Sequence, residues 1–308
     1  MAESDNSVVI TGGTSGLGLR LAELLAREAH LEVLLTGRSR SVAEAAAQGV
    51  GARGAALDLA SLASVSSFAA EVAAMTGGRP LQGLVCNAAI QVLSRSVTAE
   101  GFETTFGVNH IGNVALIEEL IRRTGPPRRI VLVSSGTHDS AQRTGMPAPL
   151  EQATARELAF PGPPQPESES EEREGRRRYA TSKLANVRTA VELSRRLADT
   201  TVVTSFDPGL MPGTGLARDA GPLQRAVWAT AFRLLLVIPS VQTPRQAARQ
   251  LAPLVTGSSP IPTGTYVERG RPGQASVAAR DTAAQHALYE DTLTLIAEAR
   301  RAGQISRS

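Results

Sequence analysis

Short runs of β-branched and apolar residues alternate with helix-like stretches along most of this chain. We expect strands at residues 8–10, 32–36, 55–58, 81–86, 130–134 and 201–206, with helices among them at 17–28, 62–75, 101–123 and 180–197. Strands separated by helices pair in parallel, and a parallel sheet needs helices on both faces. The sequence therefore predicts an α/β fold of the doubly wound (Rossmann) type, with a central parallel sheet in a single domain spanning 1–308.

Two segments interrupt this alternation. Residues 161–178 read PGPPQPESESEEREGRRR, a Pro-rich, acidic and then basic stretch that predicts a loop or disorder. Residues 223–238 are apolar and are bounded by Pro222 and Pro239. Such a stretch can pack on the core as an amphipathic helix, close over a substrate as a lid, or contact a membrane surface. The sequence leaves these three interpretations open.

A glycine-rich turn follows the first expected strand, because residues 11–18 read TGGTSGLG and lead into a helix. Glycines at this place let the backbone turn tightly and approach a pyrophosphate, and the N-terminus of the next helix offers free N–H groups. The strand before and the helix after supply the context that a glycine pattern alone lacks. We expect the dinucleotide-binding residues of this turn to be Gly12, Thr14, Ser15, Gly16, Leu17 and Gly18.

The ends of the next strands indicate which dinucleotide binds. Residues 36–38 read TGR, without the acidic residue that binds the ribose 2′-hydroxyl of NAD. Arg38, joined by Arg40 in one interpretation, can face a 2′-phosphate instead, so we expect NADP(H). Asp58 closes the third strand, where its carboxylate can accept from the adenine amino group. Asn87 follows the fourth strand, where an asparagine also forms turns for structural reasons.

Lys183 is the only lysine of the chain, and it stands four positions after Tyr179, one of three tyrosines. Residues four apart share a face of a helix, so the ammonium can lie beside the phenol. An ammonium is a compact charge with rotatable donors, which a guanidinium cannot replace. A neighbouring cation lowers the pKa of a phenol from its ordinary value of about 10. The pair therefore predicts a catalytic site.

These residues, taken in order, resemble the short-chain dehydrogenase/reductase family over roughly 8–267. The matching motifs are TGGTSGLG, Asp58, CNAA, Asn109 within VNHIG, the serines at 134–135, YATSK and DPG. Several motifs in order are more specific than any one of them. LVCNAA, TAEGFE, VNHIG and PG followed by TGL are most similar to the branch of light-dependent protochlorophyllide reductases and retinol dehydrogenases.

The resemblance implies a catalytic tetrad. Tyr179 would give its proton to the substrate oxygen as the general acid. Lys183 would lower the pKa of that tyrosine and hold the nicotinamide ribose. Ser135, in preference to Ser134, would polarise the substrate carbonyl, and Asn109 would anchor a water in a proton relay toward the lysine.

Departures from the family pattern bear on the substrate. Pro208 and Gly209 would border the nicotinamide, but Gly213 stands where many members have a threonine that contacts the amide. Ser135 and Tyr179 are 44 positions apart, so we expect an insertion at about 139–178 that borders the pocket mouth. Residues at about 209–255 would form a helical substrate lid, whose apolar content indicates a bulky hydrophobic substrate.

The resemblance thus implies an NADPH-dependent oxidoreductase that transfers hydride to a carbonyl of a bulky hydrophobic small molecule. Reduction of a C=C bond, of the protochlorophyllide reductase type, is an alternative because the same tetrad serves both reactions. A catalytically silent NADP(H)-binding sensor or scaffold is an alternative of another class, against which the intact Tyr179 and Lys183 argue.

Composition argues against several other classes. A formal charge of +3 is small for 308 residues and the arginines are scattered, so we expect no nucleic-acid partner. One cysteine, Cys86, rules out an internal disulfide and a cysteine-rich metal site, and we expect no metal. We read no signal peptide or membrane span in the sequence. We therefore expect a cytoplasmic protein with little tendency to contact a membrane surface, and the sequence leaves a homo-oligomer open.

Overall fold

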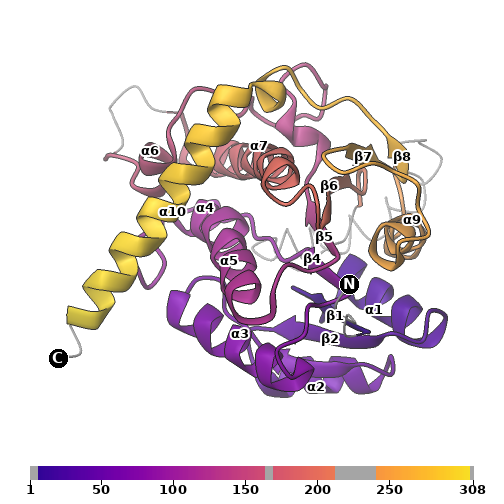
Figure 1. Ribbon diagram of the computed structural model, residues 1–308. Helices are drawn as coiled ribbons and strands as arrows, with labels where there is room; N and C mark the ends of the chain where they lie inside the picture. Colours follow the sequence, from indigo (N-terminus) through magenta and orange to yellow (C-terminus); the bar gives the residue numbers. More distant parts are fainter. Residues whose placement is uncertain (1–5, 164–168, 212–240, 306–308) are drawn as a thin grey trace, which may run out of the picture.

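The computed structural model describes residues 6–163, 169–211 and 241–305. Within them, one sheet has the strand order β3-β2-β1-β4-β5-β6-β7-β8 (Figure 1). Neighbouring strands are parallel except for the last pair, which is antiparallel. The strands are β1 (Ser7–Ile10), β2 (Glu32–Gly37), β3 (Arg53–Ala56), β4 (Gly83–Cys86), β5 (Arg129–Val133), β6 (Val202–Asp207), β7 (Tyr266–Glu268) and β8 (Arg271–Pro272).

Helices cover both faces of this sheet. They are α1 (Gly16–Arg27), α2 (Arg40–Gln48), α3 (Leu62–Thr76), α4 (Thr104–Phe106), α5 (Gly112–Thr124), α6 (Ala155–Ala159), α7 (Glu171–Arg196), α9 (Pro244–Thr256) and α10 (Thr282–Ile305). Successive residues of a strand point to opposite faces. Val9 therefore packs in the core shared with α3, α5, α7 and α10, whereas Val8 and Ile10 pack in the core shared with α1, α2 and α9. The predicted doubly wound α/β fold is confirmed.

The six predicted strands are present, with boundaries that shift by a few residues. β7 and β8 were not predicted, because they have only three and two residues and carry no long β-branched run. Their position matters for the site. β7 pairs with the end of β6, where Asp207 is in register with Glu268.

The prediction of a loop or disorder over the whole of 161–178 is wrong for its second half. Helix α7 begins at Glu171, because the Ser170 hydroxyl accepts from the backbone N–H of Arg173 and so caps the helix. Acidic residues in its first turn also form ion pairs with basic residues four positions further along, as in the contact between Arg176 and Glu172. The helix is therefore longer at its N-terminus than the apolar pattern indicates.

The sequence predicts a substrate lid at 209–255, but the structure assigns the last part of this range to the core. Helix α9 is capped by Thr243, and its Ala247, Leu251 and Val255 are fully buried in the core beside α1. Residues 244–255 therefore belong to the layer that covers the sheet. The apolar stretch 223–238 and Gly213 lie outside the described residues.

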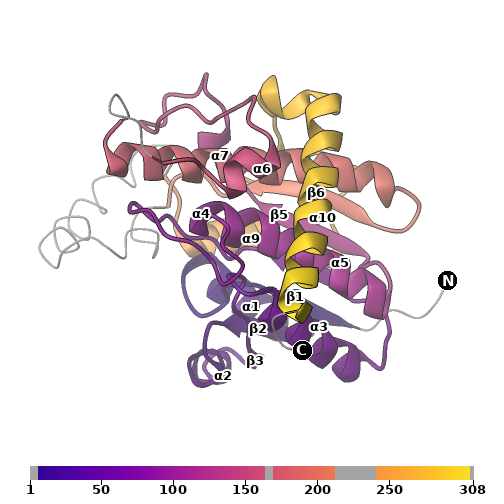
Figure 2. The same cartoon turned by 90° about the vertical axis from the view of Figure 1, so that its left-hand side faces the viewer.

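Helix α10 runs across α7, α6 and α5 on the outside of one layer (Figures 1 and 2). Ion pairs hold its second half, including Arg300 to Glu119 at 2.8 Å and Arg156 to Glu298 at 2.7 Å. A buried hydrogen bond of 3.0 Å joins its Thr292 to His110. Among the described helices, α10 included, none combines the length and the apolar character that crossing a membrane requires.

Candidate active site

A cleft of about 1150 Å³ opens at the carboxyl ends of the parallel strands. It lies where β1 stands between β2 and β4, the point at which the strand order reverses and at which open α/β sheets bind ligands. Most of the predicted site residues line it: Gly12, Thr14, Ser15, Gly16, Leu17, Arg38, Asp58, Asn87, Ser135, Tyr179, Lys183, Pro208 and Gly209. Gly18 and Asn109 are the two predicted residues that are not part of this lining.

The glycine-rich turn has a backbone that other residues could not adopt easily. Gly12 and Gly16 have φ angles of 64° and 56°, in the left-handed region that favours glycine. A Cβ on Gly18 would lie 2.6 Å from the Gly12 carbonyl oxygen, so Gly18 contributes by letting α1 pack onto the turn. Ser15 is the N-cap of α1, yet its side chain makes no capping hydrogen bond. The turn therefore presents a hydroxyl and the unpartnered N–H groups of a helix start to the cleft.

Asn87 anchors the same turn from the end of β4. Its side-chain amide donates to the carbonyl oxygens of Thr11 at 2.8 Å and Gly12 at 3.1 Å. The Thr11 hydroxyl in turn accepts from the backbone N–H groups of Asn87 and Ala88. Asn87 thus combines a place in the cleft with the turn-holding role that the sequence left open.

The two candidate arginines for a 2′-phosphate differ in their surroundings. Arg40 is paired with Glu71 at 2.8 Å and with Glu44 at 3.8 Å, and it does not line the cleft. Arg38 does line the cleft, and its side chain forms no hydrogen bond or ion pair with any residue that the structure describes. Of the two arginines, therefore, Arg38 is the one whose guanidinium is available to bind a 2′-phosphate. Asp58 also lines the cleft, and one of its carboxylate oxygens accepts from the backbone N–H of Ala60.

Tyr179 and Lys183 lie on one face of α7, as their spacing predicts. The lysine Nζ atom is 5.5 Å from the centroid of the tyrosine ring and donates to the Val133 carbonyl oxygen at 3.1 Å. Both side chains are nearly buried, with 8% of Tyr179 and 2% of Lys183 exposed. Helix α7 thereby presents a phenol and an ammonium to the cleft, beside the end of β5.

The pKa of Tyr179 moves in the direction opposite to the expected one. Burial raises the pKa of the phenol above its usual range, and the Asp207 carboxylate adds to this rise. Burial also lowers the pKa of the Lys183 ammonium to about 8, against the opposing effect of Asp207. Burial and Asp207 account for this rise, so the effect of Lys183 on the tyrosine pKa stays a prediction. The phenol keeps its proton at neutral pH.

The two serines after β5 have different hydrogen bonds. The Ser134 hydroxyl donates to the Lys183 carbonyl oxygen at 3.1 Å, which holds α7 against the strand. The Ser135 hydroxyl oxygen accepts from the backbone N–H of Thr137 at 3.4 Å, so its own hydrogen remains available. This difference agrees with the choice of Ser135 as the group that faces a substrate.

Asn109 lies in a π-helix (Gly107–Ile111) between α4 and α5 and is fully buried. Its amide donates to the Ile90 carbonyl at 2.8 Å and to the Ser182 hydroxyl at 3.0 Å, and its oxygen accepts from the Ile90 N–H at 2.8 Å. Asn113 donates to the Asn109 carbonyl at 3.0 Å. Asn109 therefore joins the loop after β4 to α7, and its role in a proton relay stays a prediction.

Sequence reasoning missed several residues of the cleft. The insertion lines it with the side chains of Gln142, Arg143, Thr144 and Met146, at a place where the sequence predicted contact but no particular residue. Asp207 also lines it, is only 3% exposed, and accepts from the Gly209 backbone N–H at 2.8 Å. Its position in the DPG motif was the available signal, but the motif was interpreted only through its proline and glycine.

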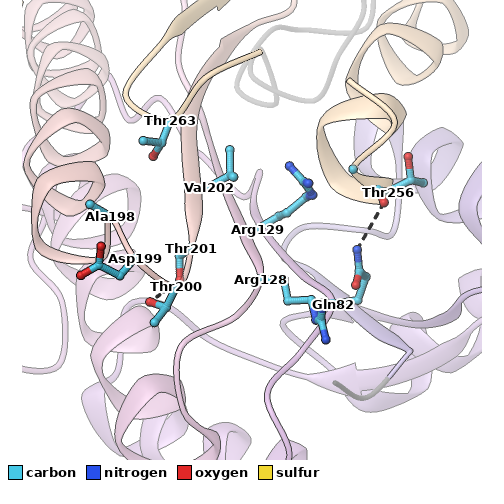
Figure 3. A pocket seen from close by; sticks show the side chains of 11 residues that line it. Gln82, Arg128, Arg129, Ala198, Asp199, Thr200, Thr201, Val202, Thr256 and Thr263 are labelled. Carbon is cyan, nitrogen blue, oxygen red and sulfur yellow. Dashed lines mark hydrogen bonds between the residues drawn. The ribbon is translucent and has the colours of Figure 1, made fainter. Parts of the chain in front are cut away.

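A second cavity, of about 580 Å³, lies at the amino ends of β5 and β6 (Figure 3). It contains Arg128 and Arg129 and none of the predicted site residues. Arg129 lies against Gly257 at the end of α9, where a cation complements the partial negative charge of a helix C-terminus. Gln82 donates to the Thr256 carbonyl at 3.3 Å across the same edge. The polar groups of this cavity therefore interact with backbone groups at the ends of helices and strands.

Comparison with known proteins agrees with this geometry. The model of the short chain dehydrogenase family matches residues 6–146. The protochlorophyllide reductase of Cucumis sativus is 33% identical over 277 residues, which cover 84% of this chain and 69% of that protein. The protochlorophyllide reductase of Avena sativa is 33% identical over 279 residues, which cover 84% of this chain and 88% of that protein.

Solved structures show the same fold. An uncharacterized protein from Mycobacterium paratuberculosis has a TM-score of 0.70 at 27% identity, covering 95% of this chain and 94% of its own. A short-chain dehydrogenase/reductase from Brucella melitensis has a TM-score of 0.60 at 18% identity, covering 87% of this chain and 97% of its own. The chain belongs to the short-chain dehydrogenase/reductase family of oxidoreductases, in its protochlorophyllide reductase-like branch.

Proposed function

We propose that this protein is an NADPH-dependent oxidoreductase that transfers hydride to a carbonyl of a bulky hydrophobic small molecule, with Tyr179 as the general acid. One observation carries the proposal. The buried Tyr179 phenol and the Ser135 hydroxyl line the same cleft as the glycine-rich turn, so a dinucleotide and a carbonyl could meet beside both hydroxyls.

The cofactor end of the cleft fits a dinucleotide phosphate. The start of α1 and the Ser15 hydroxyl would hold the pyrophosphate, and the Arg38 guanidinium, which pairs with no described residue, would bind a 2′-phosphate as a bidentate partner. Asp58 would accept from the adenine amino group, and Pro208 and Gly209 would border the nicotinamide. When bound, the reduced nicotinamide supplies the hydride.

The residues of this chain would supply the proton and the polarisation. Ser135 would donate its hydroxyl hydrogen to the substrate oxygen and stabilise the negative charge that develops there. Tyr179, which its raised pKa keeps protonated before the reaction, would release its proton to the same oxygen as negative charge develops there. Lys183, with its Nζ atom anchored on the Val133 carbonyl, would direct its other donors to the ribose hydroxyls.

The substrate end of the cleft supports a hydrophobic substrate. Its lining includes the apolar side chains Ile90, Val108, Met146, Leu210 and Met211. A cavity of about 1150 Å³ exceeds the range of about 300–1,000 Å³ that is usual for small-molecule sites, so it has room for a dinucleotide and a second molecule. We retain a cytoplasmic location as part of the proposal, and a homo-oligomer stays open.

Reduction of a C=C bond is the second candidate, and the protochlorophyllide reductases among the relatives favour it. The same residues would act, except that Tyr179 would then protonate carbon. A silent NADP(H)-binding protein is a weaker candidate because Tyr179, Lys183 and Ser135 all line the cleft.

A screen of NADPH oxidation against ketones, aldehydes and enones of graded size tests the proposal. We expect turnover with large apolar carbonyl compounds. Turnover confined to enones that lose their C=C bond would favour the second candidate, and NADPH binding without any turnover across the series would favour the silent protein.

A further inference from the structure

Three buried side chains to which the proposed reaction gives no role connect the Ser135 end of the site to the Gly209 end. They are His138, in the 3-10 helix after Ser135, Tyr266 at the start of β7, and Asp207 at the end of β6. His138 is fully buried, and Tyr266 and Asp207 are each 3% exposed. They come from three separate parts of the chain; Asp207 lines the cleft, whereas His138 and Tyr266 are not part of its lining.

The hydrogen bonds of His138 determine its tautomer. The backbone N–H of Ser276 donates to Nε2 at 3.1 Å, so Nε2 carries a lone pair. Nδ1 therefore carries the hydrogen and donates to the Ser135 carbonyl oxygen at 2.8 Å. The imidazole thus ties the backbone of the predicted carbonyl-polarising residue to the segment after β8.

Tyr266 and Asp207 continue the connection toward the cofactor end. The centroids of the His138 and Tyr266 rings are 4.8 Å apart. The Tyr266 hydroxyl donates to Asp207 Oδ2 at 2.8 Å, and Asp207 Oδ1 accepts from the Gly209 N–H at 2.8 Å. A buried carboxylate is costly unless donors satisfy it, so these two contacts hold Asp207 in one orientation.

We propose that His138, Tyr266 and Asp207 form a positioning bridge that sets Ser135 and the Pro208–Gly209 turn at a fixed separation across the cleft. The inference rests on the proposed function, because it assigns Ser135 to the substrate and Gly209 to the cofactor. His138 and Tyr266 act through these neighbours without touching the reacting atoms. We therefore expect substitutions of His138 to lower turnover and a substitution of Tyr266 to weaken cofactor binding.

A pair of His138 variants tests the Ser135 end. The asparagine amide is as many bonds from Cβ as His Nδ1, and the glutamine amide is as many as His Nε2. His138→Asn can keep the donor to Ser135, whereas His138→Gln can keep only the contact with Ser276. We expect kcat to fall about tenfold in His138→Gln and less than about threefold in His138→Asn, with the KM for NADPH within about twofold in both. An equal loss in the two folded variants, or none in His138→Gln, would overturn the bridge.

Tyr266→Phe tests the other end without needing turnover. The variant removes only the hydroxyl that orients Asp207, so we expect the dissociation constant for NADPH, measured by fluorescence titration, to rise about fivefold. Tyr289→Phe is the matched control, because its hydroxyl also donates to a carboxylate, Glu118, but lies on α10 and outside the cleft lining. That control should bind NADPH within about twofold of the wild type.

The two hypotheses fail in different ways. NADPH affinity that is unchanged in Tyr266→Phe would overturn the bridge whatever the protein reduces. A wild-type protein that binds NADPH but reduces no carbonyl would overturn the proposed reaction, while the binding comparison between Tyr266→Phe and Tyr289→Phe would still decide the bridge. Circular dichroism melting curves identify any variant that has not folded.

Discussion

The Lys183 ammonium lies 5.5 Å from the centre of the Tyr179 ring, one turn further along α7, and is held by the Val133 carbonyl at the end of β5. A backbone carbonyl is neutral, so the lysine keeps its charge and its other donors for a ligand. The same burial that brings the two groups together raises the pKa of the phenol and lowers that of the ammonium. Burial thus favours the neutral phenol over a phenolate.

Tyr179→Phe should remove the general acid while leaving the ring packed. We expect kcat to fall by about 10²–10⁴-fold, the range typical of a lost acid or base. Because the proposed phosphate and adenine contacts lie on other elements and Lys183 keeps its own donors, the dissociation constant for NADPH should stay within about threefold of the wild type. Steady-state kinetics and fluorescence titration measure the two effects. A variant with near-normal turnover would show that another group supplies the proton.

Lys183→Arg keeps the charge but should still impair the enzyme. The lysine side chain is only 2% exposed and is fitted to the Val133 carbonyl, so a larger planar guanidinium must displace its neighbours. We expect kcat/KM to fall about 100-fold, equivalent to about 2.7 kcal/mol. An arginine variant with normal kinetics would mean that a positive charge alone is enough at this position.

Lys183 should also make stability depend on pH. Its pKa falls from 10.5 to about 8 on folding, so between these values the unfolded chain binds a proton that the folded protein lacks. The contribution of Lys183 to the free energy of unfolding should therefore rise with pH, by about 2 kcal/mol between pH 8 and 10, while the raised pKa values of Cys86 and the buried tyrosines act in the opposite direction in the same range. Urea unfolding at pH 8, 9 and 10 measures this contribution as the difference between the wild type and Lys183→Met, because the opposing groups are common to both proteins and the difference should shift by this amount in favour of the wild type. Parallel pH curves for the two proteins would contradict the prediction.

Arg38→Asp should change the cofactor preference. A guanidinium that lines the cleft and pairs with none of the described residues suits a 2′-phosphate, and a carboxylate there would repel it and could accept from a ribose hydroxyl. We expect the affinity for NADPH to fall at least about tenfold and that for NADH to change less than about threefold. Arg40→Asp is the control, because Arg40 is occupied by Glu71 and Glu44. Equal effects of the two substitutions would exclude a specific phosphate contact at Arg38.

Arg178→Met should destabilise the protein through the helix that carries Tyr179. The Arg178 guanidinium is 8% exposed and lies 3.3 Å from Glu103, whose pKa burial raises, and 3.2 Å from Glu174. Removing it leaves a buried carboxyl without its ion pair, so we expect a loss of about 3 kcal/mol. Arg176→Met, which breaks an exposed pair with Glu172, should cost less than about 0.5 kcal/mol. Urea unfolding compares them, and equal losses would refute the argument from burial.

Much of the site could be predicted because its signals are local. The glycine-rich turn needs glycine at positive φ, and the spacing of Tyr179 and Lys183 places both on one face of a helix. The first half of α7 was harder to predict, since it depends on charge pairs and a serine cap rather than on an apolar pattern. The C-terminal edge of the sheet was missed because β7 and β8 owe their pairing to β6 and not to their own length.

The sequence by itself determined the alternating architecture, the family, the glycine-rich turn and the identity of the residues around Tyr179, because each of these depends on residue type and spacing along the chain. Only the tertiary structure decided the rest. It separated Arg38 from Arg40, placed Asn109 between Ile90 and Ser182, raised the pKa of Tyr179 through burial, and joined His138 to Tyr266 and Asp207. These outcomes depend on burial and on contacts between segments far apart in sequence, and such contacts form only when the whole sheet and its helical layers are assembled.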